Sequence, residues 1–383
     1  MARHYLDHAS TTPIRPEATA AMTEWSDLGV TADPGRVHTE GRMVRAALED
    51  ARDRVAGLFG VRARQVILTS GGTESVNAAV WGVLADHPRG APVACAAVEH
   101  SAVRDASARL GTVVDIGVDR LGRITATAVE EALEACRVEY GRLPLLVHCQ
   151  IANHEVGTLH DVADVVALCR TRGITVHVDA IAAAGHLPLD LDQLDADLVS
   201  VSSHKLGGPT GVGALVLRRG LRIEPLLVGG EQERGRRAGL EDVVGAIGFG
   251  AAAEVLADPG RMAEEAGAAR GHTDRLLAAA TAVDGVLPFG DVGRRVAHIL
   301  CLGVEGVEAE PVLLGLDQAG LAVHSGSSCS SESLEPSPVL EAMGVDAERS
   351  LRLSVGWSTT EGDVDAFAGA FAGVVGRLRS LRS

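Results

Sequence analysis

The chain has 383 residues, and 35 Lys and Arg against 51 Asp and Glu give it a formal net charge of −16 at pH 7. This acidic balance argues against direct binding to nucleic acid or to an anionic membrane, since both attract basic surfaces. The hydrophobic share of 46% and charged share of 22% are typical of a soluble globular protein. The length favours two domains over a single core.

Neither a targeting segment nor a membrane span is predicted. The first residues carry no apolar core of the signal type, and no apolar run approaches the roughly 20 residues that a membrane helix needs. The cysteines show neither a C-x-x-C pair nor zinc spacing; they are Cys95, Cys136, Cys149, Cys169, Cys301 and Cys329. Scattered cysteines of this kind are typical of reduced cytosolic thiols. We therefore expect a cytoplasmic protein without a metal, in which His148 and His177 face a core or a cleft.

Strand-like and helix-like segments alternate from about residue 45 to 250. Apolar runs predict strands at 66–69, 92–97, 145–148, 174–178 and 198–201, and a returning hairpin strand at 212–217. Helices are predicted at 74–84, 102–110 and 162–172. This alternation indicates an α/β domain with a mostly parallel sheet and helices on both faces.

The pattern changes after residue 250. A helix-rich stretch extends to about 283, short strands follow near 297–302 and 350–354, and a last helix begins at 361. We predict a large domain over 16–255 and a smaller α+β domain made of 1–15 and 256–383. A Ser- and Gly-rich segment at about 321–338 contains Cys329 and is predicted to be a mobile loop.

Lys205 is the single lysine of the chain, because the other 34 basic residues are arginines. A guanidinium carries charge as well as an ammonium does, but it cannot lose its proton near neutral pH and is a poor nucleophile. The exception therefore indicates chemistry that needs an amine, and a Schiff base is the first candidate. The alternative is a surface lysine that is unique by chance.

Two further motifs stand at predicted strand ends. The turn at Gly71-Gly72-Thr73 leads from a strand into a helix, where free N–H groups and the helix dipole would bind an anion; an ordinary N-cap is the competing interpretation. Asp179 ends another strand, where a carboxylate can hold the protonated nitrogen of a cofactor ring; a helix cap is again the alternative.

Lys205 follows Asp179 by 26 residues, which is one crossover unit of a parallel sheet. Both groups can thus face one crevice, with Ser202 and His204 nearby as hydrogen-bond donors to a phosphate. Ser202-x-x-Lys205 also matches the motif of penicillin-binding serine acylases. Those enzymes need K-T-G and S-D-N elements as well, and this chain has neither.

Together these motifs resemble the cysteine desulfurases of the NifS/IscS type, which are pyridoxal-phosphate enzymes of fold type I. Order and spacing agree over nearly the whole chain. The matching segments are 5–13, 70–75, 99–100, 153–157, 177–180, 203–205, 233–235, the cysteine loop with 334–337, and 351–354.

The resemblance implies a fold type I architecture, with a mostly parallel seven-stranded sheet in the large domain, and a homodimer. It implies that Lys205 carries the cofactor, that Asp179 pairs with its ring nitrogen and that His100 stacks on the ring. Gly72, Thr73, Ser202 and His204 would hold the phosphate. Asn153 would contact the cofactor and, with Arg352, the substrate carboxylate. L-cysteine would become alanine while Cys329 takes its sulfur as a persulfide for an acceptor protein, in iron–sulfur assembly, tRNA thiolation or DNA phosphorothioation.

Three positions depart from the family pattern. Ala182 stands where the family has a Gln that binds the cofactor's phenolic oxygen, Leu240 where it has a Thr that reaches the phosphate across the dimer, and Asp33 where it has an Asn near the substrate. Two alternatives stay open: another fold type I enzyme, such as an aminotransferase or selenocysteine lyase, or a sulfur-relay subunit with a weakened cofactor site.

Overall fold

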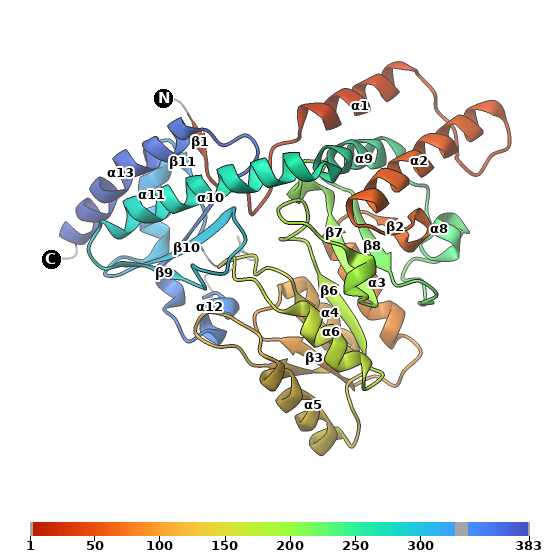
Figure 1. The fold of residues 1–383 in the computed structure, drawn as a ribbon, viewed down its shortest axis with the longest axis horizontal. Coiled ribbons are helices and arrows are strands. Elements are labelled where there is room, and N and C mark those ends of the chain that lie inside the picture. Colours follow the sequence, from red (N-terminus) through yellow and green to blue (C-terminus); the bar gives the residue numbers. More distant parts are fainter. Residues whose placement is uncertain (1–2, 326–335, 382–383) are drawn as a thin grey trace.

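The computed structural model describes residues 3–325 and 336–381. Its centre is a seven-stranded sheet in the order β2-β8-β7-β6-β5-β3-β4, in which only β8 runs against its neighbours. The strands are β2 (Val66–Thr69), β3 (Ala91–Ala96), β4 (Gly111–Ile116), β5 (Leu146–Gln150), β6 (Thr175–Asp179), β7 (Leu198–Ser202) and β8 (Gly213–Leu217). The predicted α/β fold and mostly parallel sheet are confirmed (Figure 1).

Helices cover both faces of this sheet (Figure 1). One face packs against α3 (Gly72–Leu84) and α4 (Ser101–Leu110). The other packs against α2 (Thr39–Leu58), α5 (Ala126–Tyr140), α6 (Val162–Arg170) and α9 (Val243–Ala257). The helix α1 (Pro16–Asp27) lies against α9.

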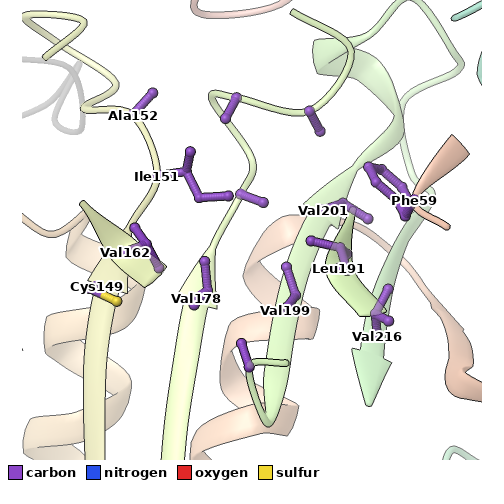
Figure 2. Packing of buried hydrophobic residues seen from close by; sticks show 14 of the residues in the cluster. Phe59, Cys149, Ile151, Ala152, Val162, Val178, Leu191, Val199, Val201 and Val216 are labelled. Atoms are coloured by element: carbon purple, nitrogen blue, oxygen red, sulfur yellow. The ribbon is translucent and has the colours of Figure 1, made fainter. Parts of the chain in front are cut away.

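The strand period of two divides the side chains of β5, β6 and β7 between these faces. Cys149, Val178, Val199 and Val216 come from four neighbouring strands and belong to one apolar cluster with α2, α6 and α9 (Figure 2). The alternate residues point toward α3 and α4. There an apolar cluster that includes Leu146 covers only the beginning of the strands, and polar residues follow.

A second, antiparallel sheet has the order β12-β10-β9. Its strands are β9 (Val286–Phe289), β10 (Ile299–Val304) and β12 (Ser350–Ser354), and a separate cluster packs them against α11 (Ala309–Gln318) and α13 (Glu361–Ser380). Leu6 joins this cluster, and β1 (His4–Tyr5) pairs with β11 (Leu321–Ala322). The long α10 (Pro259–Thr281) connects the two sheets (Figure 1).

The predicted domain boundary after residue 255 falls inside α9, two residues before its end; the division itself stays a prediction. Within the described ranges no single helix is long and apolar enough to cross a membrane, although α9 and α10, bent by 85° at their junction, pass the length and composition test as a pair.

Candidate active site

A cavity of about 290 Å³ opens where β5, β6 and β7 end. Its wall contains seven of the residues predicted from sequence: Gly72, Thr73, His100, Asp179, Ser202, His204 and Lys205, with Arg352 as an eighth from the small sheet. The carboxyl ends of parallel strands meet at one edge, which explains why residues far apart in sequence converge here. His154, Gln150, Ser10 and Ala182 complete much of the lining.

Lys205 enters the cavity from the single turn Ser203–Lys205 that follows β7. Its Nζ donates hydrogen bonds to the carbonyl oxygens of Ala9 and, at 2.9 Å, Ser10. Arg15 fixes the segment that follows, because its Nε donates to the Leu206 carbonyl at 2.9 Å. The amine therefore lies in a hydrogen-bonded turn that lines the cavity and not on an exposed surface.

Asp179 is the last residue of β6, and it is buried. One carboxylate oxygen accepts the Ile181 N–H at 2.8 Å. Burial raises the pKa of this carboxyl, while the Ile181 hydrogen bond and the positive charges of His100 and Lys205 lower it. A buried carboxylate in such a place is stabilised by a cation, and a protonated ring nitrogen supplies one.

The start of α3 has a geometry that could hold an anion. Gly71 has φ 149°, a backbone conformation that favours glycine, and a Cβ on Gly72 would lie 2.4 Å from the Ile181 side chain. Ser202 Oγ is buried and has no hydrogen-bond partner among the described residues. Free helix N–H groups beside an unsatisfied hydroxyl fit a phosphate, so these residues and Asp179 together fit pyridoxal phosphate.

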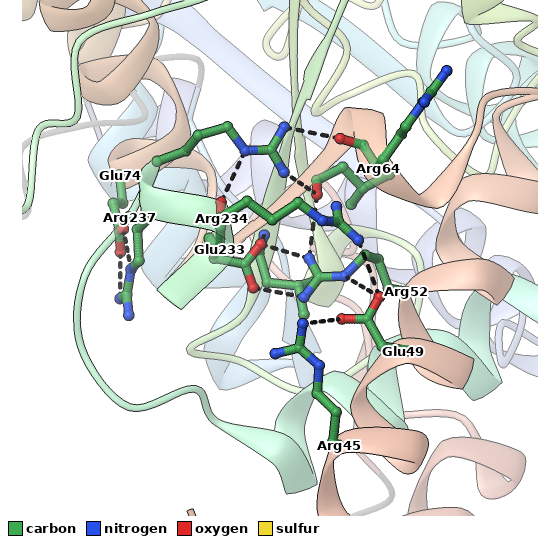
Figure 3. Close-up of polar contacts among 11 residues, drawn as sticks. Arg45, Glu49, Arg52, Arg64, Glu74, Glu233, Arg234 and Arg237 are labelled. Carbon is green, nitrogen blue, oxygen red and sulfur yellow. Dashed lines mark hydrogen bonds and ion pairs between the residues drawn. The ribbon is translucent and has the colours of Figure 1, made fainter. Parts of the chain in front are cut away.

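An ion pair braces this cradle from outside. Glu74, in the first turn of α3, accepts the Ser70 N–H at 2.8 Å. It also accepts the Nε–H of Arg237 at 2.9 Å (Figure 3). The nearby Glu233 and Arg234 have positive φ angles of 51° and 61°, which are costly for non-glycine residues. A buried pair at 2.5 and 2.7 Å between Arg52 and Glu233 holds this segment against α2, and the Leu68 N–H of β2 donates to Glu233 at 3.1 Å.

His100 is the N-cap of α4, and its Nδ1 accepts the Ala102 N–H at 3.0 Å. Its ring meets the ring of His154 edge to face, with 4.9 Å between centroids. Burial lowers the pKa of His154 to about 4, so that this ring is neutral at pH 7. No role was predicted for His154. Its position directly after Asn153 in a matched motif was the available signal.

The two predicted substrate-binding residues differ in placement. Arg352 lines the cavity and donates to the His154 carbonyl at 3.1 Å and to Ser10 Oγ at 2.6 Å. Asn153 is fully buried and is absent from the cavity wall; its Oδ1 accepts the Glu155 and Val156 N–H groups, both at 2.9 Å. In this structure Asn153 therefore shapes a turn behind the cavity, and its binding role stays a prediction.

Residues 4–367 match the family described as aminotransferase class-V. The chain belongs to this family. It is 38% identical to an IscS-like cysteine desulfurase of Mycobacterium tuberculosis, over 98% of the chain and 97% of the relative, and 35% identical to cysteine desulfurase IscS of Dictyoglomus turgidum, over 98% and 95%. The solved structure of a NifS-like protein superposes with a TM-score of 0.89 at 27% identity, covering 98% of this chain and all of that one. The predicted resemblance and the fold type I architecture are confirmed.

The departures from the desulfurase pattern within this family lie in different settings. Ala182 lines the cavity, so a donor to the cofactor is absent from that point of the wall. Leu240 is 63% exposed. Asp33 does not line the cavity; its carboxylate pairs with Arg36 at 3.1 Å and accepts the Gly35 N–H at 2.7 Å. Cys329 and most of the predicted cysteine loop lie outside the described residues.

Proposed function

We propose that this protein is a pyridoxal-phosphate-dependent cysteine desulfurase. It converts L-cysteine to L-alanine: the carbon–sulfur bond of the substrate breaks, a sulfur–sulfur bond forms on Cys329, and a proton takes the place of sulfur on the substrate carbon. The observation that carries the proposal is the lone amine of Lys205 in one cavity with a buried carboxylate and a phosphate cradle. The names of the curated relatives support the choice of substrate.

Each residue has a role that follows from its chemistry. Lys205 would attach the cofactor and move the proton at the substrate Cα. Asp179 would balance the ring nitrogen, while Gly72, Thr73, Ser202 and His204 would hold the phosphate. Burial lowers the pKa of His204 to about 4, so it would act as a neutral hydrogen-bond partner. When bound, the cofactor supplies the electron sink that no side chain provides.

Three residues would serve the substrate. Arg352 would bind its carboxylate, since a guanidinium suits a planar anion. His100 would lie on the cofactor ring and exchange protons with the substrate. Cys329 would take the sulfur and deliver it to an acceptor protein.

The acceptor is the open part of the proposal, and iron–sulfur assembly and DNA phosphorothioation are the leading pathways. A homodimer would double the charge of −16, which favours an acceptor with a basic face and disfavours direct contact with DNA. Acceptor binding should then weaken as salt concentration rises. Trapping the acceptor as a mixed disulfide with Cys329 would identify it.

The attachment test uses the single lysine. The chain offers two amines that can react with pyridoxal phosphate, Lys205 and the α-amino group. Borohydride reduction of the protein with the cofactor should label the peptide that contains Lys205. Lys205→Ala should abolish that label and the visible absorption band. Cofactor binding without label at Lys205 would contradict the proposal.

The sulfur test compares two cysteines. Cys329→Ser should abolish alanine formation from L-cysteine, whereas Cys136→Ser, a buried thiol in α5, should leave it unchanged. Alanine formation that survives Cys329→Ser would favour another fold type I enzyme. Cofactor binding with no turnover in the unmodified protein would favour the relay subunit.

A further inference from the structure

Four buried side chains form an unbroken row of hydrogen bonds beneath the candidate site. Ser107 Oγ lies 3.2 Å from His148 Nε2, His148 Nδ1 lies 2.9 Å from His177 Nδ1, and His177 Nε2 lies 2.8 Å from Ser200 Oγ. All four residues have no exposed surface. They belong to α4, β5, β6 and β7, which are four of the elements that bring a polar residue to the cavity wall.

The spacing along each element connects the row to the site. On each strand the row residue precedes a cavity residue by two positions, which places both on one face of the sheet; the cavity residues are Gln150, Asp179 and Ser202. On α4, Ser107 follows the N-cap His100 by seven positions, or two helical turns. Ser200 is also the Cα partner of Asp179 in the sheet, so the row ends beside that carboxylate.

Two neutral histidine rings can supply the hydrogens that the three hydrogen bonds of the row need. Burial lowers the pKa of His177 to about 3 and that of His148 well below its ordinary value, so both rings are neutral at pH 7. A neutral imidazole carries one N–H. The bond between the two Nδ1 atoms needs one hydrogen, so one ring carries its proton on Nδ1 and the other on Nε2. All three hydrogen bonds then point the same way along the row.

We propose that Ser107, His148, His177 and Ser200 are positioning residues that hold His100, Asp179 and Ser202 at fixed mutual distances. The inference rests on the proposed function, because it assigns the row to the cofactor site. Valine and cysteine fill the opposite face of the same strands, so packing alone does not require polar residues here. Directional hydrogen bonds fix the spacing of α4 and three strands in a way that apolar contacts do not.

The first test needs no cofactor. NMR of the cofactor-free protein with ¹⁵N-labelled histidine should show one of His148 and His177 as the Nδ1–H tautomer and the other as the Nε2–H tautomer, both neutral at pH 7. Two Nε2–H rings, or an imidazolium at either position, would contradict the proposed hydrogen bonding along the row. This result does not depend on whether the protein is a desulfurase.

The second test measures positioning. His148→Phe should weaken pyridoxal phosphate binding roughly tenfold, the smallest loss seen when a hydrogen-bond partner of a metal ligand is removed, and should shift the visible band of the bound cofactor. His148→Asn, whose amide can still meet His177, should recover most of the affinity. Ser107→Ala is the milder variant should His148→Phe fail to fold, with a smaller change in the same direction.

His160→Phe is the matched control. His160 is also buried and neutral, with a pKa lowered to about 4, but it lies outside the row and outside the cavity wall. It should lower the melting temperature without changing cofactor affinity or the visible band. Equal losses of affinity in His148→Phe and His160→Phe, or none in His148→Phe, would overturn the positioning role. Failure of the unmodified protein to bind the cofactor would count instead against the proposed function.

Discussion

On one face of β5, β6 and β7 the side chains are apolar, and they join the main hydrophobic cluster with α2, α6 and α9. On the other face β5 and β7 begin with apolar residues; these strands and β6 then continue with the row of His148, His177 and Ser200 and end at the cavity. Both faces are buried along β5 and β7, and along β6 from its second residue onward. The difference shows that burial and apolar character are separate: one face stabilises the fold by excluding water, and the other keeps polar groups buried by giving them partners.

Asp179 and Val178 are neighbours in sequence on opposite faces, so they provide the sharpest test of this division. Asp179→Asn should reduce alanine formation by roughly 10³-fold, because a neutral amide does not balance a protonated ring nitrogen. The free energy of unfolding of the cofactor-free protein should stay equal or rise, since a buried carboxyl with a raised pKa is removed. Turnover and urea unfolding of the same preparation would measure both quantities. A large loss of stability in Asp179→Asn would mean that Asp179 stabilises the fold as the apolar residues do, and would contradict the prediction.

Val178→Ala should show the reverse behaviour. It removes two methyl groups from a fully buried site and should lower the free energy of unfolding by about 2 kcal/mol. Turnover per folded molecule should stay within about twofold of the unmodified protein, because the side chain points away from the cavity. Urea unfolding measures the first effect and alanine formation the second. A tenfold loss of turnover with unchanged stability would contradict the assignment of the face.

Much of this arrangement follows from the sequence. Runs such as 198–201 predict buried strands correctly because a strand covered on both faces is almost continuously apolar. The edge strand β4 is mostly half exposed, so it lacks that signal and was not predicted. Lys205 could be found because it is the single lysine of the chain, and Asp179 and Gly72 because their motifs stand at predicted strand ends and match the family pattern. The row of four residues could not, because His148 and His177 are 29 residues apart, and only the register of β5 with β6 brings them together.

Acidification should act on the buried histidines, of which His177 lies on the polar face, and should leave the apolar face unaffected, with a smaller effect per group than either substitution. Burial lowers the pKa of His177 to about 3, and those of His154, His160 and His186 to about 4, from an ordinary 6.5. A base with a depressed folded-state pKa binds fewer protons when folded. Its contribution to stability is therefore present above pH 6.5 and is lost as the pH falls toward its folded pKa.

The free energy of unfolding should thus decrease between pH 7 and pH 5, and each such histidine should contribute less than about 1.4 kcal/mol per pH unit. Val178→Ala should give a parallel curve, lower at every pH, because valine does not titrate. His160→Gln should give a shallower curve, because one titrating group is missing. Urea unfolding at several pH values would measure all three slopes. A steeper slope in Val178→Ala than in the unmodified protein would mean that the two faces are energetically coupled, and the division between them would fail.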